Sequence, residues 1–263
     1  MVSPALPAAS ITPGDSYVQS FARGLAVIRS FSADAPAQTL SEVAQRAGLT
    51  RAGARRILLT LQTLGYVDTE GRLFRLTPKI LDLGFAYLSS LPLWQRAEPV
   101  MQTLVAQVHE SCSAAVLDGP DIVYVLRVPT QKIMRINLGI GSRLPAYCTS
   151  MGRVLLADLA SAECSARLAM RPPEALTART LTDAQAITEA IEAVRRDGYS
   201  LVDQELEEGL VSIAVPLRDR AGRTVAALNI SGQANRTPPD TMREHLLPKL
   251  QAAAAEIGRL LAA

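Results

Sequence analysis

Residues 39–76 constrain the fold of this chain more than any other stretch. Thr39 and Glu42 match the S/T-x-x-E capping box, in which the two side chains satisfy free backbone N–H groups at the start of a helix. Apolar residues then repeat at helical spacing up to Gly48, a residue typical of the position just past a helix end. Thr50 can cap a second helix, whose apolar positions repeat at the spacing of a buried stripe. The stretch therefore predicts two short helices joined by a tight turn.

The remaining face of this second helix is basic. It carries arginines separated by small residues, and no acidic residue occurs between Thr50 and Val67. Two strand-like arms follow, joined at Glu70 and Gly71, a pair typical of a hairpin turn. This is the pattern of a helix-turn-helix with a wing, in which one helix enters the major groove and its N-terminal residues reach the base edges. The DNA-binding residues that we predict are Ser41, Thr50, Arg51, Ala52, Arg55, Arg56, Arg72 and Arg75.

The N-terminal part of the chain is also more basic than the rest. Residues 1–80 contain nine Lys and Arg against five Asp and Glu, whereas residues 81–263 contain eighteen against twenty. The alternative to DNA binding is a small helical subdomain with a solvated basic face. That alternative would account for the arginines but not for the other features. The cap, the turn, the basic helix face and the wing together favour DNA binding. A basic N-terminal module on a slightly acidic larger domain is typical of a DNA reader that carries a second function.

Four segments are expected along the chain. Residues 1–16 lack the positive start of a signal peptide and contain three prolines, so we interpret them as a disordered leader. Residues 17–77 form the winged helix-turn-helix domain. Residues 78–90 form an apolar linker helix, which packs either on its own larger domain or on a second subunit. Residues 91–263 form the larger domain.

The first helix of the DNA-binding domain is expected over about residues 18–31. One of its faces is apolar and is expected to pack under the two helices of the reading unit. This face contains Val18, Phe21, Leu25 and Ile28. Residues 32–38 are expected to form a short loop.

In the larger domain, apolar runs and helical periodicity predict strands interspersed with helices. The expected strands span residues 113–117, 122–128, 134–138, 199–203, 211–217 and 224–230. The expected helices span residues 94–111, 150–159, 161–170, 183–197 and 240–261. An antiparallel sheet flanked by helices, an α+β fold, is the simplest assembly of these elements.

The sequence lacks the patterns typical of catalysis. Neither His109, expected in mid-helix, nor His245 stands in an H-E-x-x-H frame, and no G-x-S-x-G or G-x-x-x-x-G-K-[ST] stretch occurs. Glu205, Glu207 and Glu208 form an acidic cluster without a histidine, which we interpret as a solvated turn. The sequence therefore predicts neither an enzyme nor a metal or cofactor site.

Cysteine usage and hydropathy predict a cytoplasmic protein. Cys112, Cys148 and Cys164 include no C-x-x-C pair, which argues against a disulfide framework and against a thiolate metal site. No segment approaches the roughly 20 apolar residues that span a bilayer. We therefore expect reduced thiols and no membrane partner.

Residues 145–152 place small hydroxyl side chains at an expected helix start, where free N–H groups and the helix dipole favour a carboxylate or phosphate. Arg135, on the polar face of the preceding strand, and Arg143, in a loop, could pair with a carboxylate through two hydrogen bonds. The alternative is that the hydroxyl groups are only helix caps and the arginines are surface charges. The effector-binding residues that we predict are Arg135, Asn137, Arg143, Tyr147, Cys148, Thr149, Ser150, Met151, Gly152, Ser212, Asn229 and Ser231.

Together with the winged module and the linker helix, residues 141–157 (GSRLPAYCTSMGRVLLA) and 225–231 (VAALNIS) resemble the IclR family of bacterial transcriptional regulators. The resemblance runs from about Tyr17 to the C-terminus. It implies a winged helix-turn-helix on a GAF-like effector domain, acting as a dimer or a dimer of dimers on a double-stranded DNA operator. Some relatives carry a cysteine where Ser212 stands, among residues around a small-acid effector.

Within the family, residues 16–25 and 144–153 resemble the branch that regulates the β-ketoadipate pathway of aromatic acid breakdown. Those regulators answer to compounds such as protocatechuate, 4-hydroxybenzoate or β-ketoadipate. Three alternatives stay open: an IclR-type regulator of another small-acid or multidrug pathway, an enzyme fused to a DNA-binding module, and a constitutive DNA-binding structural protein.

Overall fold

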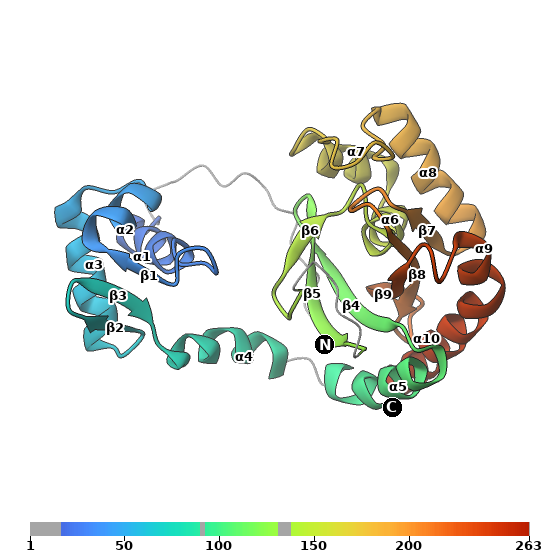
Figure 1. Ribbon diagram of the computed structural model, residues 1–263, viewed down its shortest axis with the longest axis horizontal. Helices are drawn as coiled ribbons and strands as arrows, with labels where there is room; N and C mark the ends of the chain where they lie inside the picture. Colours follow the sequence, from blue (N-terminus) through green and yellow to red (C-terminus); the bar gives the residue numbers. More distant parts are fainter. Residues whose placement is uncertain (1–16, 90–92, 131–137, 263) are drawn as a thin grey trace. The chain divides into compact units, whose positions relative to one another are not determined.

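The computed structural model describes residues 17–89, 93–130 and 138–262. The chain divides into two compact units, one up to residue 90 and the other from residue 91 onward (Figure 1). The overall fold is α+β, as the sequence predicts.

The first unit is a helix-turn-helix followed by a hairpin wing. Its helices are α1 (Gln19–Arg29), α2 (Leu40–Arg46) and α3 (Arg51–Thr63). Its strands β1 (Ala37–Thr39), β2 (Val67–Glu70) and β3 (Leu73–Leu76) pair antiparallel in the order β1-β3-β2. The small apolar core between these elements consists of Val27, Val43, Ala44, Ala54, Leu58, Leu61 and Val67. The winged helix-turn-helix is confirmed.

The two helix starts that the sequence predicts are both capped. The Thr39 backbone N–H donates to Glu42 Oε2 at 2.7 Å, and the Glu42 N–H donates to Thr39 Oγ1 at 3.4 Å. Thr50 Oγ1 accepts the Gly53 N–H at 3.1 Å. Between the two helices Gly48 has φ +65°, a left-handed conformation in which glycine carries no Cβ penalty. The capping box and the turn therefore have the geometry that the sequence predicts.

Helix α1 does not bury the face that the sequence predicts. Val18, Phe21 and Leu25 are 61%, 68% and 43% exposed, whereas Val27 is fully buried and Ile28 is partly buried. The physical reason is size, because the small core of this unit reaches only the C-terminal part of α1. Strand β1 was also missed, since its three residues carry no alternating apolar pattern and form a strand only by pairing with β3.

A short 3-10 turn, η1 (Pro78–Ile80), leads into the linker helix α4 (Leu81–Ser89). Thr77 Oγ1 accepts the Lys79 N–H at 3.3 Å, and Lys79 Nζ donates to the Leu64 carbonyl oxygen at 2.9 Å. The start of the linker is thereby held against the end of α3. Four large apolar side chains of α4 are at least half exposed, namely Leu81, Leu83, Phe85 and Tyr87.

The second unit is built on a six-stranded antiparallel sheet in the order β6-β5-β4-β9-β8-β7. The strands are β4 (Ser111–Asp118), β5 (Asp121–Val128), β6 (Arg143–Pro145), β7 (Ser200–Asp203), β8 (Leu210–Arg218) and β9 (Thr224–Gln233). The helices are α5 (Leu93–Val108), α6 (Ser150–Ala157), α7 (Ser161–Ala169), α8 (Ala184–Asp197), α9 (Pro239–Thr241) and α10 (Leu247–Ala262).

Helices cover both faces of this sheet (Figure 1). Helix α6 lies on one face with α8 packed against it, and α5 and α10 lie together on the other face. The core under α6 combines small sheet residues, such as Ala115 and Ala227, with larger helix residues, such as Met151 and Leu156. Small side chains on the sheet let the start of α6 approach the strands closely, which matters for the site below.

Several boundaries differ from those expected. Helix α5 ends at Val108 because His109 has φ 54°, so His109 follows the helix rather than standing within it. The helix expected over residues 240–261 is interrupted by a π-helical turn, η2 (Met242–Leu246), just before Pro248, which has no N–H to donate to the preceding turn. The strand expected over residues 134–138 lies outside the described residues apart from Leu138. Among the described residues, no helix has the length and apolar character that crossing a membrane requires.

Candidate DNA-reading helix and effector pocket

The outer face of α3 presents the arginines that the sequence singles out. Arg51, Arg55 and Arg56 are exposed, with Ala52 exposed between them. No carboxylate among the described residues pairs with any of these three arginines, so their guanidiniums are available to phosphates or base edges. Exposed Ser41, on α2, and Thr50, which caps α3, complete the predicted set on this helix pair.

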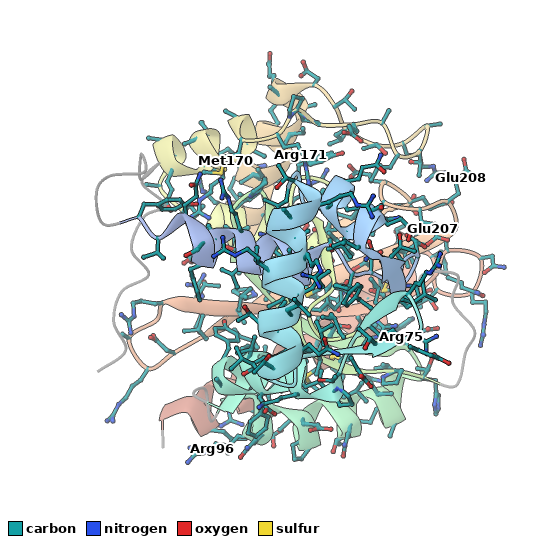
Figure 2. All side chains as sticks on the ribbon, turned by 90° about the vertical axis from the view of Figure 1, so that its left-hand side faces the viewer. Arg75, Arg96, Met170, Arg171, Glu207 and Glu208 are labelled. Carbon is teal, nitrogen blue, oxygen red and sulfur yellow. The ribbon has the colours of Figure 1, made fainter. Side chains whose placement is uncertain are left out.

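The wing adds two further cations. Arg72 is exposed in the turn between β2 and β3, and Arg75 lies on β3 (Figure 2). Arg75 Nη1 is 2.9 Å from Glu70 Oε2, but both side chains are more than half exposed. An exposed ion pair of this kind contributes little to stability, so it leaves Arg75 able to exchange partners.

In the second unit, a cavity of about 30 Å³ lies between the start of α6 and the sheet. It brings together seven of the predicted effector-binding residues, namely Cys148, Thr149, Ser150, Met151, Ser212, Asn229 and Ser231. The other residues that line it, Tyr124, Arg127, Leu138, Val202, Leu206 and Leu210, were not predicted. The pocket is therefore mostly apolar with a few convergent polar groups, as small-molecule sites generally are.

The polar part of the pocket is a connected hydrogen-bond cluster. Ser150 Oγ and Ser212 Oγ are 2.5 Å apart, and Asn229 Nδ2 donates to Ser212 Oγ at 3.1 Å and to Ser231 Oγ at 2.8 Å. Asn229 Oδ1 in turn accepts the Ser113 backbone N–H at 3.1 Å. Ser150 and Asn229 are almost fully buried. Buried polar groups are costly unless they are satisfied, so this cluster fixes the start of α6 against the sheet.

Burial keeps the thiol and the phenol of the lining neutral. It raises the pKa of the Cys148 thiol to about 11 and that of the Tyr124 phenol to about 12. Both groups are therefore protonated at neutral pH. Thr149 caps α6, because its Oγ1 accepts the Gly152 N–H at 3.2 Å. The cap that the alternative interpretation proposed is thus present, and it coexists with the pocket.

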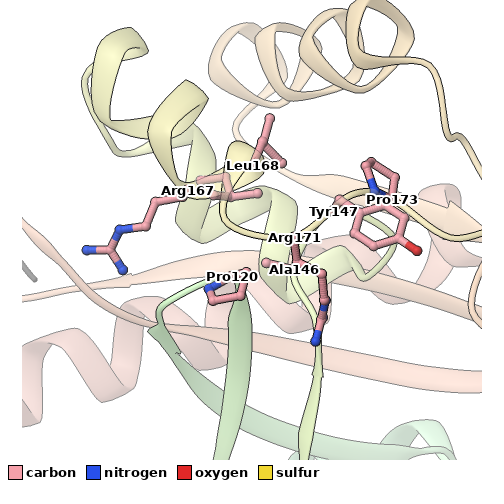
Figure 3. Close-up of a pocket in the computed structure, with 8 residues that line it drawn as sticks. Pro120, Ala146, Tyr147, Arg167, Leu168, Arg171 and Pro173 are labelled. Atoms are coloured by element: carbon pink, nitrogen blue, oxygen red, sulfur yellow. The ribbon is translucent and has the colours of Figure 1, made fainter. Parts of the chain in front are cut away.

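Three predicted residues lie apart from the pocket. Arg143 pairs with Asp118 at 2.7 Å and with Asp121 at 3.4 Å on the surface, because the β4–β5 turn supplies carboxylates beside it. Tyr147 donates its hydroxyl to the Glu174 carbonyl oxygen at 2.6 Å and lines a separate shallow pocket with Pro120, Arg167 and Arg171 (Figure 3).

Gly152 also has a packing role rather than a place in the lining. A Cβ at Gly152 would lie only 2.1 Å from the Ala146 carbonyl oxygen, so the glycine allows α6 to pack against the segment before it. Arg135 and Asn137 lie outside the described residues.

Glu205 is not in a solvated turn, which corrects the interpretation of the acidic cluster. Arg153 on α6 donates to both of its carboxylate oxygens, at 2.7 and 2.6 Å, and both side chains are buried. The Leu181 N–H also donates to Glu205 at 3.2 Å. Glu208 remains exposed on the same loop (Figure 2). The partner of Glu205 is distant in sequence, so local composition gave no signal of the pair.

Sequence patterns gave little indication that the unpredicted lining residues belong to the pocket. Arg127 lies on β5 beside Ser113 of β4, and its Nη1 donates to Ser113 Oγ at 3.3 Å. A charged residue inside an otherwise apolar strand is unusual, and this contrast could have drawn attention to Arg127. The apolar wall from Leu206 and Leu210 depends on the course of the β7–β8 loop, which no local pattern specifies.

Comparison with known proteins agrees with this architecture. The family model described as "IclR helix-turn-helix domain" matches residues 20–71, and "Bacterial transcriptional regulator IclR C-terminal" matches residues 85–259. The Pca regulon regulatory protein of Pseudomonas putida is 41% identical over 258 residues, 98% of this chain and 89% of that protein. The p-hydroxybenzoate hydroxylase transcriptional activator of Acinetobacter baylyi is 37% identical over 252 residues, 94% of this chain and 93% of that protein.

A solved structure is similar over almost the same length. An IclR homolog from Microbacterium hydrocarbonoxydans, crystallised in complex with 4-hydroxybenzoate, has a TM-score of 0.81 at 26% identity. The match covers 92% of this chain and 98% of that one. Because two models of one family match residues 20–71 and 85–259, the chain belongs to the IclR family of DNA-binding transcriptional regulators, which are not enzymes.

Proposed function

We propose that this chain is a cytoplasmic, effector-responsive regulator of genes for aromatic acid breakdown, and that its effector is a small aromatic carboxylate. The observation that carries the proposal is the buried cluster of Ser150, Ser212, Asn229 and Ser231 at an apolar cavity. An apolar wall suits a ring, and the polar cluster suits its oxygen substituents. One relative is named as an activator for p-hydroxybenzoate hydroxylase, and another binds 4-hydroxybenzoate.

Operator recognition is assigned to α3 and the wing. Arg51, Arg55 and Arg56 reach base edges and phosphates in the major groove, and Arg72 contacts a flanking phosphate or the minor groove. Ser41 and Thr50 add hydrogen bonds to the DNA backbone, and the small side chain of Ala52 lets α3 approach the DNA closely. The support is the exposed basic face of α3, free of acidic partners among the described residues.

The effector acts by shifting a conformational equilibrium. A cavity of about 30 Å³ has room for a water molecule or two, so an aromatic ring enters only when wall side chains such as Leu206 and Leu210 move. A ligand that requires this movement favours one state of the domain over the other. If that state also changes the geometry between two DNA-binding modules, ligand and operator are coupled, and the coupling is reciprocal.

The regulator is proposed to work as a dimer or a dimer of dimers. Each chain supplies one helix-turn-helix, and such modules commonly bind paired half-sites as dimers. Exposed Phe21 on α1 and exposed Phe85 on α4 provide apolar surface that a second copy of the chain can cover. Sedimentation equilibrium of the full chain tests this: Phe21→Glu and Phe85→Glu should each shift the mass toward the monomer, and an unchanged mass for both would reject these faces.

The decisive experiment is fluorescence anisotropy with the DNA upstream of the protein's own gene and a shuffled control. Titrations at several salt concentrations, with and without a panel of aromatic and aliphatic acids, separate site-specific binding from phosphate contacts. We expect tighter binding to the native fragment, altered by one aromatic acid. Equal, steeply salt-dependent binding to both fragments would reject the regulator. A response only to an aliphatic acid would indicate that the protein regulates another pathway.

The variant that tests the effector pocket in the same assay is Ser150→Ala. It removes one hydroxyl from the cluster without touching the first unit, so it should weaken the response to the acid while leaving operator affinity unchanged. Thr188→Ala, which removes an exposed hydroxyl on α8, serves as the control. A full response in the Ser150 variant would remove this residue from the site.

A further inference from the structure

Arg127 differs from every other shielded arginine that the structure describes in the second unit. Arg153, Arg167, Arg171 and Arg195 are buried or half-buried, and each pairs with a carboxylate. Arg127 is half-buried too, but among the described residues its side chain bonds only to the neutral Ser113 hydroxyl. A partly desolvated cation without a counter-charge is unfavourable, and its remaining N–H donors form a fork that matches a carboxylate.

Arg127 is also the one charged side chain among the described residues that line the pocket. Cys148 and Tyr124 are protonated at neutral pH, as burial raises the pKa of each. The serines and Asn229 are neutral. A carboxylate placed beside any other described lining residue would therefore lose water without gaining an oppositely charged partner.

At the serine cluster, the donor and the acceptor of each hydrogen bond follow from the hydrogens and lone pairs that each group has. The Ser113 backbone N–H can only donate, so Asn229 Oδ1 faces it and Asn229 Nδ2 faces the serines. Ser212 Oγ accepts from Asn229 at 3.1 Å and from Ser231 at 3.3 Å, which occupies both of its lone pairs. Ser212 must then donate to Ser150 Oγ, 2.5 Å away. The Ser150 hydroxyl hydrogen is left to donate into the pocket.

Arg127 and Asn229, whose amide bonds to the serine cluster, stand at opposite ends of one row across the sheet. Ser113 on β4 is in register with Arg127 on one side and with Asn229 on the other. Adjacent strands are about 4.8 Å apart, so Arg127 and Asn229 are separated by about 10 Å at their backbones. Tyr124 and Met151 supply apolar surface to the same cavity.

We propose that the effector binds with its carboxylate on Arg127 and with an oxygen at the far end of its ring accepting from Ser150. This inference rests on the proposed function and specifies the orientation and class of the ligand: a flat aromatic acid with an oxygen substituent opposite the carboxylate. Arg127 supplies most of the affinity for any benzoate. Ser150 supplies the preference for the oxygen-bearing ring.

The test is isothermal titration calorimetry of the full chain with benzoate and with 4-hydroxybenzoate. Arg127→Gln should weaken both acids about 10- to 100-fold, because it removes a charge-assisted pair. Ser150→Ala should weaken 4-hydroxybenzoate about 2- to 10-fold and leave benzoate unchanged, because benzoate has no oxygen there. Arg167→Gln, at a half-buried arginine of the separate pocket in Figure 3, should change neither affinity.

Thermal melting of each variant shows whether it folds. If Arg127→Gln does not fold, Arg127→Lys keeps the charge but loses the planar fork, and a smaller loss with both acids supports the proposal. The orientation would be overturned if the Arg127 variants kept full affinity and Ser150→Ala weakened the two acids equally. That result would place the carboxylate on α6 and would leave the aromatic effector itself unaffected. Binding of neither acid to the wild-type chain would overturn the aromatic effector itself, and the orientation with it.

Discussion

The arginines of α3 come from six consecutive residues and stand on an exposed helix face. The polar groups of the pocket, in contrast, are buried or half-buried and meet from distant parts of the chain. Ser150 and Ser212 are 62 residues apart, and Asn229 reaches Ser212 from 17 residues further on. Substitutions on the helix face should therefore change DNA binding without unfolding the protein. Substitutions around the pocket should change ligand binding and stability together, because the same side chains serve both.

The largest effect is expected at the buried pair beside the pocket. Glu205→Ala leaves the Arg153 guanidinium buried without its carboxylate, which should cost about 3–5 kcal/mol of unfolding free energy. Denaturant titration followed by the fluorescence of Trp94 measures this, because Trp94 is the single tryptophan of the chain and lies in the second unit.

The matched control is Asp203→Ala, which breaks an ion pair between Asp203 and an Arg179 side chain that is 57% exposed. That change should cost less than about 1 kcal/mol, because exposed pairs are screened by water. Similar costs for the two variants would contradict the difference in burial on which the comparison stands.

A smaller effect is expected on the DNA side. Arg55→Ala should cost about 1–3 kcal/mol of specific operator affinity if Arg55 reads a base pair, with no change in unfolding free energy. Arg72→Ala should instead weaken native and shuffled DNA alike and reduce the salt slope by about one, as the loss of a phosphate contact does. Anisotropy titrations separate the two; an Arg55 variant that binds the operator normally would remove it from the reading set.

The features that could be predicted from the sequence are those that a few neighbouring residues determine. The capping box at Thr39, the turn at Gly48 and the basic face of α3 each depend on residues within one or two helical turns. The helix start at Ser150 and the alternation of Asn229 and Ser231 on one strand are equally local. These positions lie together in the pocket because the sheet brings β8 and β9 under α6.

The features that were missed depend on contacts between distant segments. Arg143 looks like a ligand arginine until the β4–β5 turn brings Asp118 beside it, and Glu205 looks solvated until Arg153 reaches it. The place of Arg127 in the pocket depends on the register of β5 against β4, including an irregularity at Ala114 and Ala115. No window of a few residues contains that information.

The N-terminal cap of α2 should show a modest effect confined to the first unit. Thr39→Ala removes a capping hydroxyl and should cost about 1 kcal/mol of local stability, whereas Thr39→Ser should cost little. Hydrogen exchange of the α2 amides, read by mass spectrometry, measures the local opening, with the amides of α8 as an internal control. Faster exchange in α8 as well would show that the two units are not independent in the way the comparison requires.

The smallest effect is a pH dependence at the same cap. The backbone N–H of Thr39 and then its hydroxyl donate to the Glu42 carboxylate, and these bonds hold its pKa below the ordinary value of 4.5. A carboxyl whose folded pKa is lowered stabilises the fold above its unfolded pKa, and this contribution is lost as the pH falls through the folded value. Wild type and Glu42→Gln should therefore differ in α2 exchange at pH 6 and converge in acid, after correction for intrinsic rates. A difference that persists below the folded pKa would assign the effect to side-chain shape rather than to charge, and would leave the cap without its electrostatic part.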